Sequence, residues 1–123
     1  MHEYLNKVML IGEIKGEIDY GKTKLGKKIY NFTLLVKEPS ERSKDFNKET
    51  EACFYRVAVF KEQLIEEIEH ENIQRNDKVY VEGRLSVRRR VINGTESFNA
   101  QIVLKDPFSN IIVLEEGENW PEV

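Results

Sequence analysis

Apolar and polar positions alternate along much of the chain, which is the pattern of strands with one buried face. Segment 29–36 keeps a period of two and places Tyr30, Phe32 and Leu34 on one face. Segment 5–14 begins with the same alternation and then becomes apolar on both faces, which predicts a buried strand. Four more segments rich in β-branched and aromatic residues predict further strands: 53–60, 78–90, 97–104 and 110–114.

One segment has helical spacing instead of alternation. Between residues 61 and 72, Leu64, Ile65 and Ile68 recur at the interval that lines one side of a helix, and glutamates occupy many of the remaining positions. The sequence therefore predicts a single amphipathic helix, which follows three strands and precedes the others.

Turn-forming residues separate these elements. Residues 15–28 are rich in glycine and lysine and predict turns with a short edge strand at 17–20. The Asn-Gly pair at 93–94 predicts a tight hairpin turn, because both residues tolerate positive φ. Gly83 lies in the middle of a long predicted strand and predicts a bulge or a sharp bend there. Residues 37–51 are almost entirely polar and predict a long loop.

This order of elements predicts an all-β fold. A five-stranded Greek-key barrel, with one helix between strands 3 and 4 and a long hairpin between strands 4 and 5, is the architecture of the OB-fold. A β-sandwich or an SH3-like barrel accounts for the number of strands but not for a lone helix at this position. We expect the barrel to occupy residues 1–115 and a short acidic tail to occupy residues 116–123.

The composition bounds the class of protein. A chain of 123 residues with 40% apolar residues is expected to form one domain, and its longest apolar run is too short to cross a bilayer. The single cysteine, Cys53, cannot form an internal disulfide, and the first residues lack the features of an export signal, which favours the cytoplasm. His2, His70 and Cys53 are too scattered for a metal site, so no metal or other cofactor is expected.

The net charge of −3 argues against a nucleic-acid partner only if the charge is spread evenly over the chain, and it is not. Residues 61–78 carry 3 basic and 6 acidic side chains, and residues 106–123 carry 0 basic and 5 acidic ones. Subtracting these contributions of −3 and −5 leaves +5 on the rest of the chain. The acidic residues are expected on the helix and the tail, away from a basic surface that would attract phosphates.

Four segments occur in the order and at nearly the spacing of a known family: 6–12 (NKVMLIG), 31–34 (NFTL), 54–60 (FYRVAVF) and 79–85 (VYVEGRL). Together they resemble the bacterial single-stranded DNA-binding proteins over residues 4–115. The resemblance implies an OB-fold, a homo-oligomer that is usually a tetramer and alternatively a dimer, and no catalysis. It also implies binding of single-stranded DNA without sequence specificity, which protects the strand in replication, recombination and repair.

The resemblance also implies which residues contact DNA. Phe54 and Phe60 occupy positions where the family has aromatic residues that stack on bases, and Arg56 matches a basic residue beside them. Phe98 matches an aromatic residue on the fifth strand. The apolar start of the first strand, residues 8–11, is where the family pairs its subunits.

The chain departs from the family at three places. Ser40 and Arg90 stand where the family usually has tryptophan. The family also continues past the barrel into a long flexible stretch whose acidic tip recruits partner enzymes, whereas this sequence stops at Val123. We therefore expect weaker stacking and a larger contribution from charge, although the plane of an arginine also stacks on a base.

The residues themselves carry the chemistry that such binding requires, namely cations along a groove with aromatic rings between them. A period of two places Phe54, Arg56 and Phe60 on one strand face. It also makes a basic stripe of alternate residues from Arg84 to Arg90, with Arg89 on the opposite face. The expected stacking residues are Phe54, Phe60, Phe98 and Phe46, and the expected backbone contacts are Arg56, Arg84, Arg88, Arg89, Arg90, Lys7, Lys22 and Lys28.

Other interpretations of these residues stay open. Phe54 and Phe60 could belong to the barrel core, and the arginines could serve only to keep an exposed hairpin in solution. A tail-less adaptor similar to the primosomal replication protein would mainly recruit a replication partner, and an RNA-binding OB domain would share the barrel but not the four segments. An enzyme is disfavoured because no nucleophile, acid–base pair or metal set is found. Replication or repair proteins are the other expected partners, and no membrane is expected.

Overall fold

The computed structural model describes residues 4–39 and 50–117. These residues form six strands and one helix, close to the elements that the alternation predicts. The predicted loop residue Phe46 and the predicted tail beyond residue 117 lie outside the described residues. The strands are β1 (Val8–Lys22), β2 (Lys28–Pro39), β3 (Thr50–Val59), β4 (Lys78–Ile92), β5 (Thr95–Leu104) and β6 (Asn110–Glu115), and the helix is α1 (Glu62–His70).

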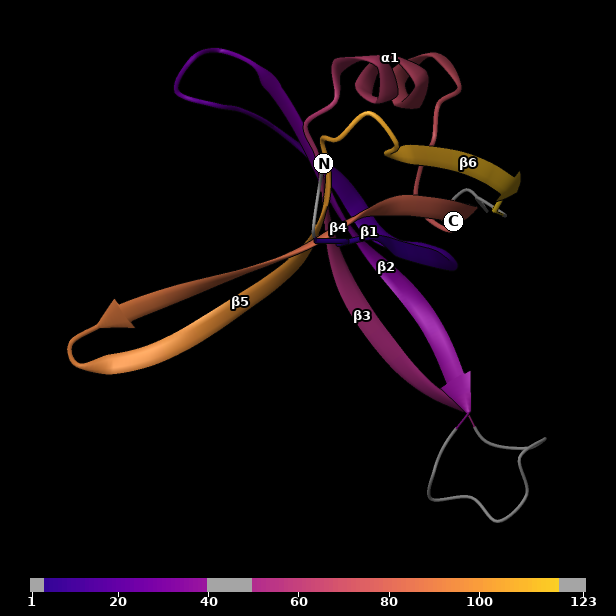
Figure 1. The fold of residues 1–123 in the computed structure, drawn as a ribbon. Coiled ribbons are helices and arrows are strands. Elements are labelled where there is room, and N and C mark those ends of the chain that lie inside the picture. Colours follow the sequence, from indigo (N-terminus) through magenta and orange to yellow (C-terminus); the bar gives the residue numbers. More distant parts are fainter. Residues whose placement is uncertain (1–3, 40–49, 118–123) are drawn as a thin grey trace, which may run out of the picture.

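Five of the strands close into a barrel (Figure 1). β1 pairs with β2 and also with β4, while β4 pairs with β5. The barrel closes where β5 meets β3 in a parallel pairing, which joins residues 57–59 to residues 102–104. β6 extends the sheet by pairing with the first residues of β4. The predicted five-stranded OB-fold barrel is thereby confirmed.

The core is filled from the inward side of every strand of the barrel and from one side of the helix. Leu34, Val59 and Val79 are fully buried, each on a different strand. Leu64, Ile65 and Ile68 of α1 pack into the same cluster, so the helix covers one end of the barrel. The spacing that predicts an amphipathic helix therefore identifies the residues that it buries.

The helix is two residues shorter at its C-terminal end than the apolar spacing predicts. It ends at His70, and Asn72 adopts a left-handed backbone conformation with φ of 54°. The amide of Ile73 then donates to the carbonyl of Ile68 at 3.0 Å, which closes the last turn. Within the residues that the structure describes, no helix is long and apolar enough to cross a membrane.

The expectation for residues 15–28 is confirmed only in part, because residues 17–20 do form a strand but lie within a longer one. β1 continues to Lys22 and pairs with β2 along this stretch, with an irregularity in the register between Lys15 and Asp19. Gly16 lies in this irregularity with φ of 73°, so the strand accommodates its extra residues at a glycine and then resumes the ladder. The turn itself is confined to residues 23–27, between β1 and β2.

Of the bulge or sharp bend expected at Gly83, the bulge is contradicted, although the position does need glycine. The register of β4 passes through Gly83 without a shift, and here β4 changes partner from β1 to β5. A Cβ atom at this position would lie 2.6 Å from the carbonyl oxygen of Val103 and 2.9 Å from Cδ1 of Leu104. Glycine is therefore required by the close approach of β5. The predicted hairpin turn is confirmed, because Asn93 and Gly94 both have positive φ.

Candidate nucleic-acid interface

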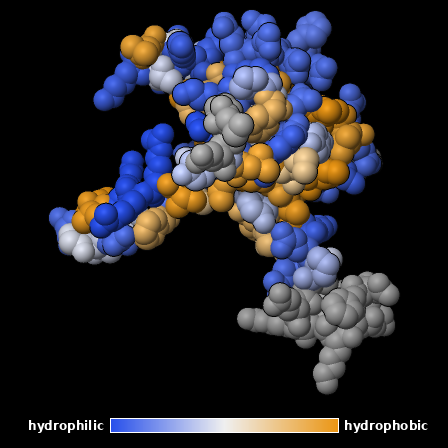
Figure 2. All heavy atoms as spheres, viewed as in Figure 1, coloured by the Kyte–Doolittle hydropathy of each residue, from blue (hydrophilic) through white to orange (hydrophobic). Residues whose placement is uncertain are grey.

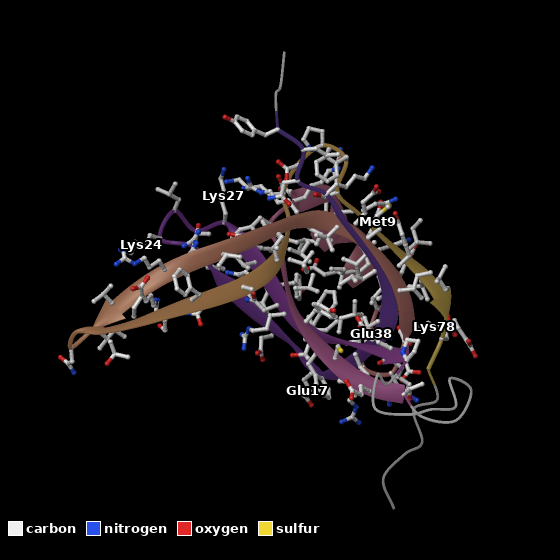
Figure 3. The ribbon with its side chains drawn as sticks, turned by 60° about the horizontal axis from the view of Figure 1, so that its bottom comes forward. Met9, Glu17, Lys24, Lys27, Glu38 and Lys78 are labelled. Carbon is white, nitrogen blue, oxygen red and sulfur yellow. The ribbon has the colours of Figure 1, made fainter. Side chains whose placement is uncertain are left out.

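Three two-stranded arms extend from the barrel and carry most of the predicted contact residues. In Figure 1 the β1–β2 hairpin points to the upper left, the β4–β5 hairpin to the lower left, and β2 and β3 to the lower right. Lys24 and Lys27, in the turn between β1 and β2, lie on the same side of the barrel as the β4–β5 hairpin (Figure 3). Met9 and Lys78 lie on the other side.

The outer face of β3 presents a ring and a cation side by side. Val57 points into the barrel and is buried, so the alternate residues Phe54 and Arg56 point outward. Phe54 is 64% exposed and Arg56 is also exposed. Phe54 is therefore a surface residue and not part of the core.

Phe60 is half-buried and lies just beyond the end of β3, where its amide donates to the carbonyl of Leu104 at 2.9 Å. It lines a pocket of about 490 Å³ between the β1–β2 turn and α1. The pocket combines an apolar floor with charges of both signs. Its other lining residues are Gly26, Lys27, Lys28, Glu62, Ile65 and Glu66.

The β4–β5 hairpin has a basic face. Arg84, Ser86, Arg88 and Arg90 alternate along β4, and their partners on β5 are uncharged: Val103, Gln101, Asn99 and Ser97. Arg84 differs from the others because its Nε lies 3.3 Å from Oδ2 of Asp106. Arg88 and Arg90 are exposed and form no ion pair within the part of the chain that the structure describes. The predicted stripe exists, and its two outer arginines are free.

The opposite face of the same hairpin is largely apolar. Leu85, Val87 and Val91 are between 43% and 57% exposed, and they alternate with the basic residues. Phe98, which is 64% exposed, lies directly opposite Arg89 on this face. The Nε atom of Arg89 donates to Oε1 of Glu96 at 2.8 Å.

The remaining predicted cations differ in whether a carboxylate of the protein already pairs with them. Lys22 is exposed at the end of β1. Nζ of Lys7 lies 2.6 Å from Oε1 of Glu82, and this hydrogen bond raises the pKa of Lys7. Nζ of Lys28 lies 3.4 Å from Oε1 of Glu69 on the helix. The predicted separation of acid from the basic surface is thus incomplete, because carboxylates of β4 and α1 reach Lys7 and Lys28.

One hydrogen-bonded pair beside this surface was not predicted. The hydroxyl of Tyr30 donates to Oε1 of Glu69 at 2.8 Å, and this bond raises the pKa of Tyr30 to about 12. The rings of Tyr20 and Tyr30 lie 5.4 Å apart on neighbouring strands. Together with Lys28, the pair connects the β1–β2 hairpin to α1. No sequence signal pairs residues 30 and 69, although the strand pattern does place Tyr30 on the inward face.

A separate apolar patch covers the far side of the barrel from the hairpin. Met9 and Ile11 of β1 and Ile112 and Leu114 of β6 are 45–61% exposed. These strands flank β4, where Tyr80 pairs with both Ile11 and Ile112 and is half-buried. Figure 2 shows hydrophobic atoms gathered over β6 on this side. We call Met9, Ile11, Tyr80, Ile112 and Leu114 the apolar patch.

Solved structures share this fold. The chain is similar to a Plasmodium falciparum single-stranded DNA-binding protein in complex with single-stranded DNA, with a TM-score of 0.80, 25% identity and coverage of 94% of this chain and 99% of that one. A mitochondrial single-stranded DNA-binding protein from S. cerevisiae has the same fold at 20% identity, with a TM-score of 0.67 and coverage of 90% and 96%.

Sequence comparison gives the same relationship. The single-stranded DNA-binding protein of Rickettsia felis is 31% identical over 112 residues, which cover 90% of this chain and 73% of that protein. The protein of the same name from Rhizobium meliloti is 25% identical, with coverage of 90% and 64%. Residues 5–108 match the family described as the single-strand binding protein family. The chain therefore belongs to the single-strand binding protein family.

Proposed function

We propose that this protein binds single-stranded DNA without sequence specificity and protects it during replication, recombination and repair. The observation that carries the proposal is the pairing of exposed rings with exposed cations on the arms. Phe54 lies beside Arg56 on β3, and Phe98 lies on the hairpin that bears Arg88 and Arg90. A flat ring stacks on any base, and a guanidinium neutralises any phosphate, so this chemistry selects single strands over duplex without reading sequence.

The proposed role is binding and not catalysis. Among the described residues, no group of three or more His, Cys, Asp or Glu side chains could hold a metal ion. The proposed stacking residues are Phe54, Phe60, Phe98 and Phe46, and the proposed backbone contacts are Arg56, Arg84, Arg88, Arg89, Arg90, Lys7, Lys22 and Lys28. We propose a cytoplasmic location, in keeping with the single free cysteine.

The apolar patch supports self-association. Apolar side chains from neighbouring strands are exposed together there, and such patches are typical of protein interfaces. Among the described residues, the edge of β1 away from β4 has no strand partner at residues 8–12, since the pairing with β2 begins only at Glu13. We propose a homo-oligomer of this chain, a tetramer or alternatively a dimer.

A second function, recruitment of a replication or repair protein with only weak DNA binding, has one observation in its favour. Carboxylates already occupy several of the cations: Lys7, Lys28, Arg84 and Arg89. A phosphate can contact one of these cations only by displacing its carboxylate. Ion pairing within the protein therefore weakens the contribution of charge to DNA binding.

Titration of a fluorescently labelled oligo-dT by anisotropy, at low and high salt, tests the main proposal. We expect tight binding at low salt and a fall in affinity with salt, because single strands release about 0.7 counterion for each phosphate neutralised. Phe54→Ala should weaken binding by roughly tenfold at every salt concentration, since one stacked base is lost. Absence of binding at low salt would refute the proposal. Binding weaker than about micromolar at physiological salt, with tight binding to a replication protein, would favour the adaptor.

A further inference from the structure

The two faces of the β4–β5 hairpin offer a DNA strand different chemistry. On the basic face, Arg88 and Arg90 lie opposite Asn99 and Ser97, so this face is positively charged. On the apolar face, the charge of Arg89 is offset by Glu96 at 2.8 Å. A phosphate is attracted to the first face but gains little at the second, which is close to neutral.

The apolar face instead holds two flat groups next to each other. Phe98 and Arg89 are directly opposite in the antiparallel ladder, which brings their side chains into contact range on the same face. The ring is 64% exposed, and the side chain of Arg89 is also 64% exposed. Glu96 accepts from Nε of Arg89, which limits the positions of the guanidinium and leaves its plane available.

We propose that Phe98 and the guanidinium of Arg89 form a base-stacking platform, in which Glu96 is the positioning residue. This inference rests on the proposed function and assigns Arg89 to the bases and not to the phosphates. Leu85, Val87 and Val91 extend the platform, because they expose apolar side chains on the same face. Arg88 and Arg90 supply the phosphate contacts of the hairpin.

Adjacent arginines give a matched pair of variants. Arg89→Lys and Arg88→Lys both keep the positive charge and lose the planar group, but on opposite faces. Each is titrated with oligo-dT and with an abasic oligonucleotide of the same length, and the ratio of the two dissociation constants measures the contribution of the bases. We expect Arg89→Lys to lower the preference for oligo-dT roughly 2- to 5-fold and Arg88→Lys to leave it unchanged. Arg88→Ala should instead flatten the salt dependence for both oligonucleotides.

The variant Glu96→Gln distinguishes two roles of Glu96: orienting the guanidinium of Arg89, and competing with DNA phosphates for it. If Glu96 orients the guanidinium, the variant lowers the preference for oligo-dT over the abasic strand. If it only competes with phosphates for Arg89, both strands bind more tightly by the same factor, and the platform is overturned. Equal effects of Arg89→Lys and Arg88→Lys on the preference would overturn it too. These outcomes require that the unmodified protein binds oligo-dT; failure to bind would refute the proposed function itself.

Discussion

At the scale of single residues, Tyr30 and Glu69 form a contact whose strength depends on pH. The hydrogen bond between them raises the pKa of Tyr30 to about 12 and lowers the pKa of Glu69 below its ordinary 4.5. A raised tyrosine pKa stabilises the fold below the unfolded value of 10.0, and this contribution is lost as the pH rises towards 12. A lowered glutamate pKa stabilises the fold above 4.5, and this contribution is lost as the pH falls.

We therefore expect Tyr30→Phe to lower the free energy of unfolding between about pH 5 and pH 10, with a smaller difference from the unmodified protein at either extreme. Urea unfolding at a series of pH values measures this. Tyr20→Phe is the matched control, because its ring packs against Tyr30 but Glu69 accepts from Tyr30. A difference that stays constant from about pH 3 to pH 12 would contradict this account.

The direction of a single side chain is predictable from the sequence where a repeat determines it, and is not predictable where a distant partner does. The period of two predicts that Phe54 and Arg56 share a face, and that Arg89 points away from Arg88 and Arg90. The ion pairs were not predicted. Glu82 and Asp106 reach Lys7 and Arg84 only after the chain has folded, because these partners are far apart in sequence or lie in a loop.

At the scale of elements, the ladder with a neighbouring strand overrides local composition. Residues 15–22 are rich in glycine and lysine, yet they form a strand because β2 supplies hydrogen-bonding partners along them. Six strands and the helix were predictable because their buried residues recur at regular intervals. The role of Gly83 was not predictable, since it depends on how closely β5 approaches β4.

Gly83→Ala tests this close approach. The added methyl group clashes with both the backbone of Val103 and the side chain of Leu104, and we expect a loss of about 1–3 kcal/mol in the free energy of unfolding. Gly21→Ala is the control, because a Cβ at Gly21 meets nothing within 4 Å and its φ is not positive. Urea unfolding compares the two variants. Equal stabilities would show that β5 can move aside at no cost.

At the scale of the whole molecule, the β4–β5 hairpin and the apolar patch lie on opposite sides of the barrel (Figure 3). The DNA contacts proposed on this hairpin and the proposed subunit interface therefore do not compete for the same residues. The apolar start of β1 indicated this interface from the sequence. The contribution of Ile112 and Leu114 did not follow from the sequence, because it depends on β6 pairing with β4 beside β1.

We expect Ile112→Glu to dissociate the oligomer, because it places a charge within the apolar patch. Sedimentation velocity over a range of concentrations measures the change. Val91→Glu is the matched control, since Val91 is also exposed but lies on the hairpin. If both variants keep the mass of the unmodified protein, the patch is not the interface.

The short parallel pairing that closes the barrel also constrains the order of events during synthesis. It joins β3 to β5 by three residue pairs, and all six residues are buried. β3 therefore leaves the ribosome long before its partner, and its apolar edge at residues 57–59 has no strand to cover it until residue 104 has emerged. β5 is the last strand of the barrel to be synthesised, so the barrel closes only when residues 102–104 reach β3 across this long separation in sequence.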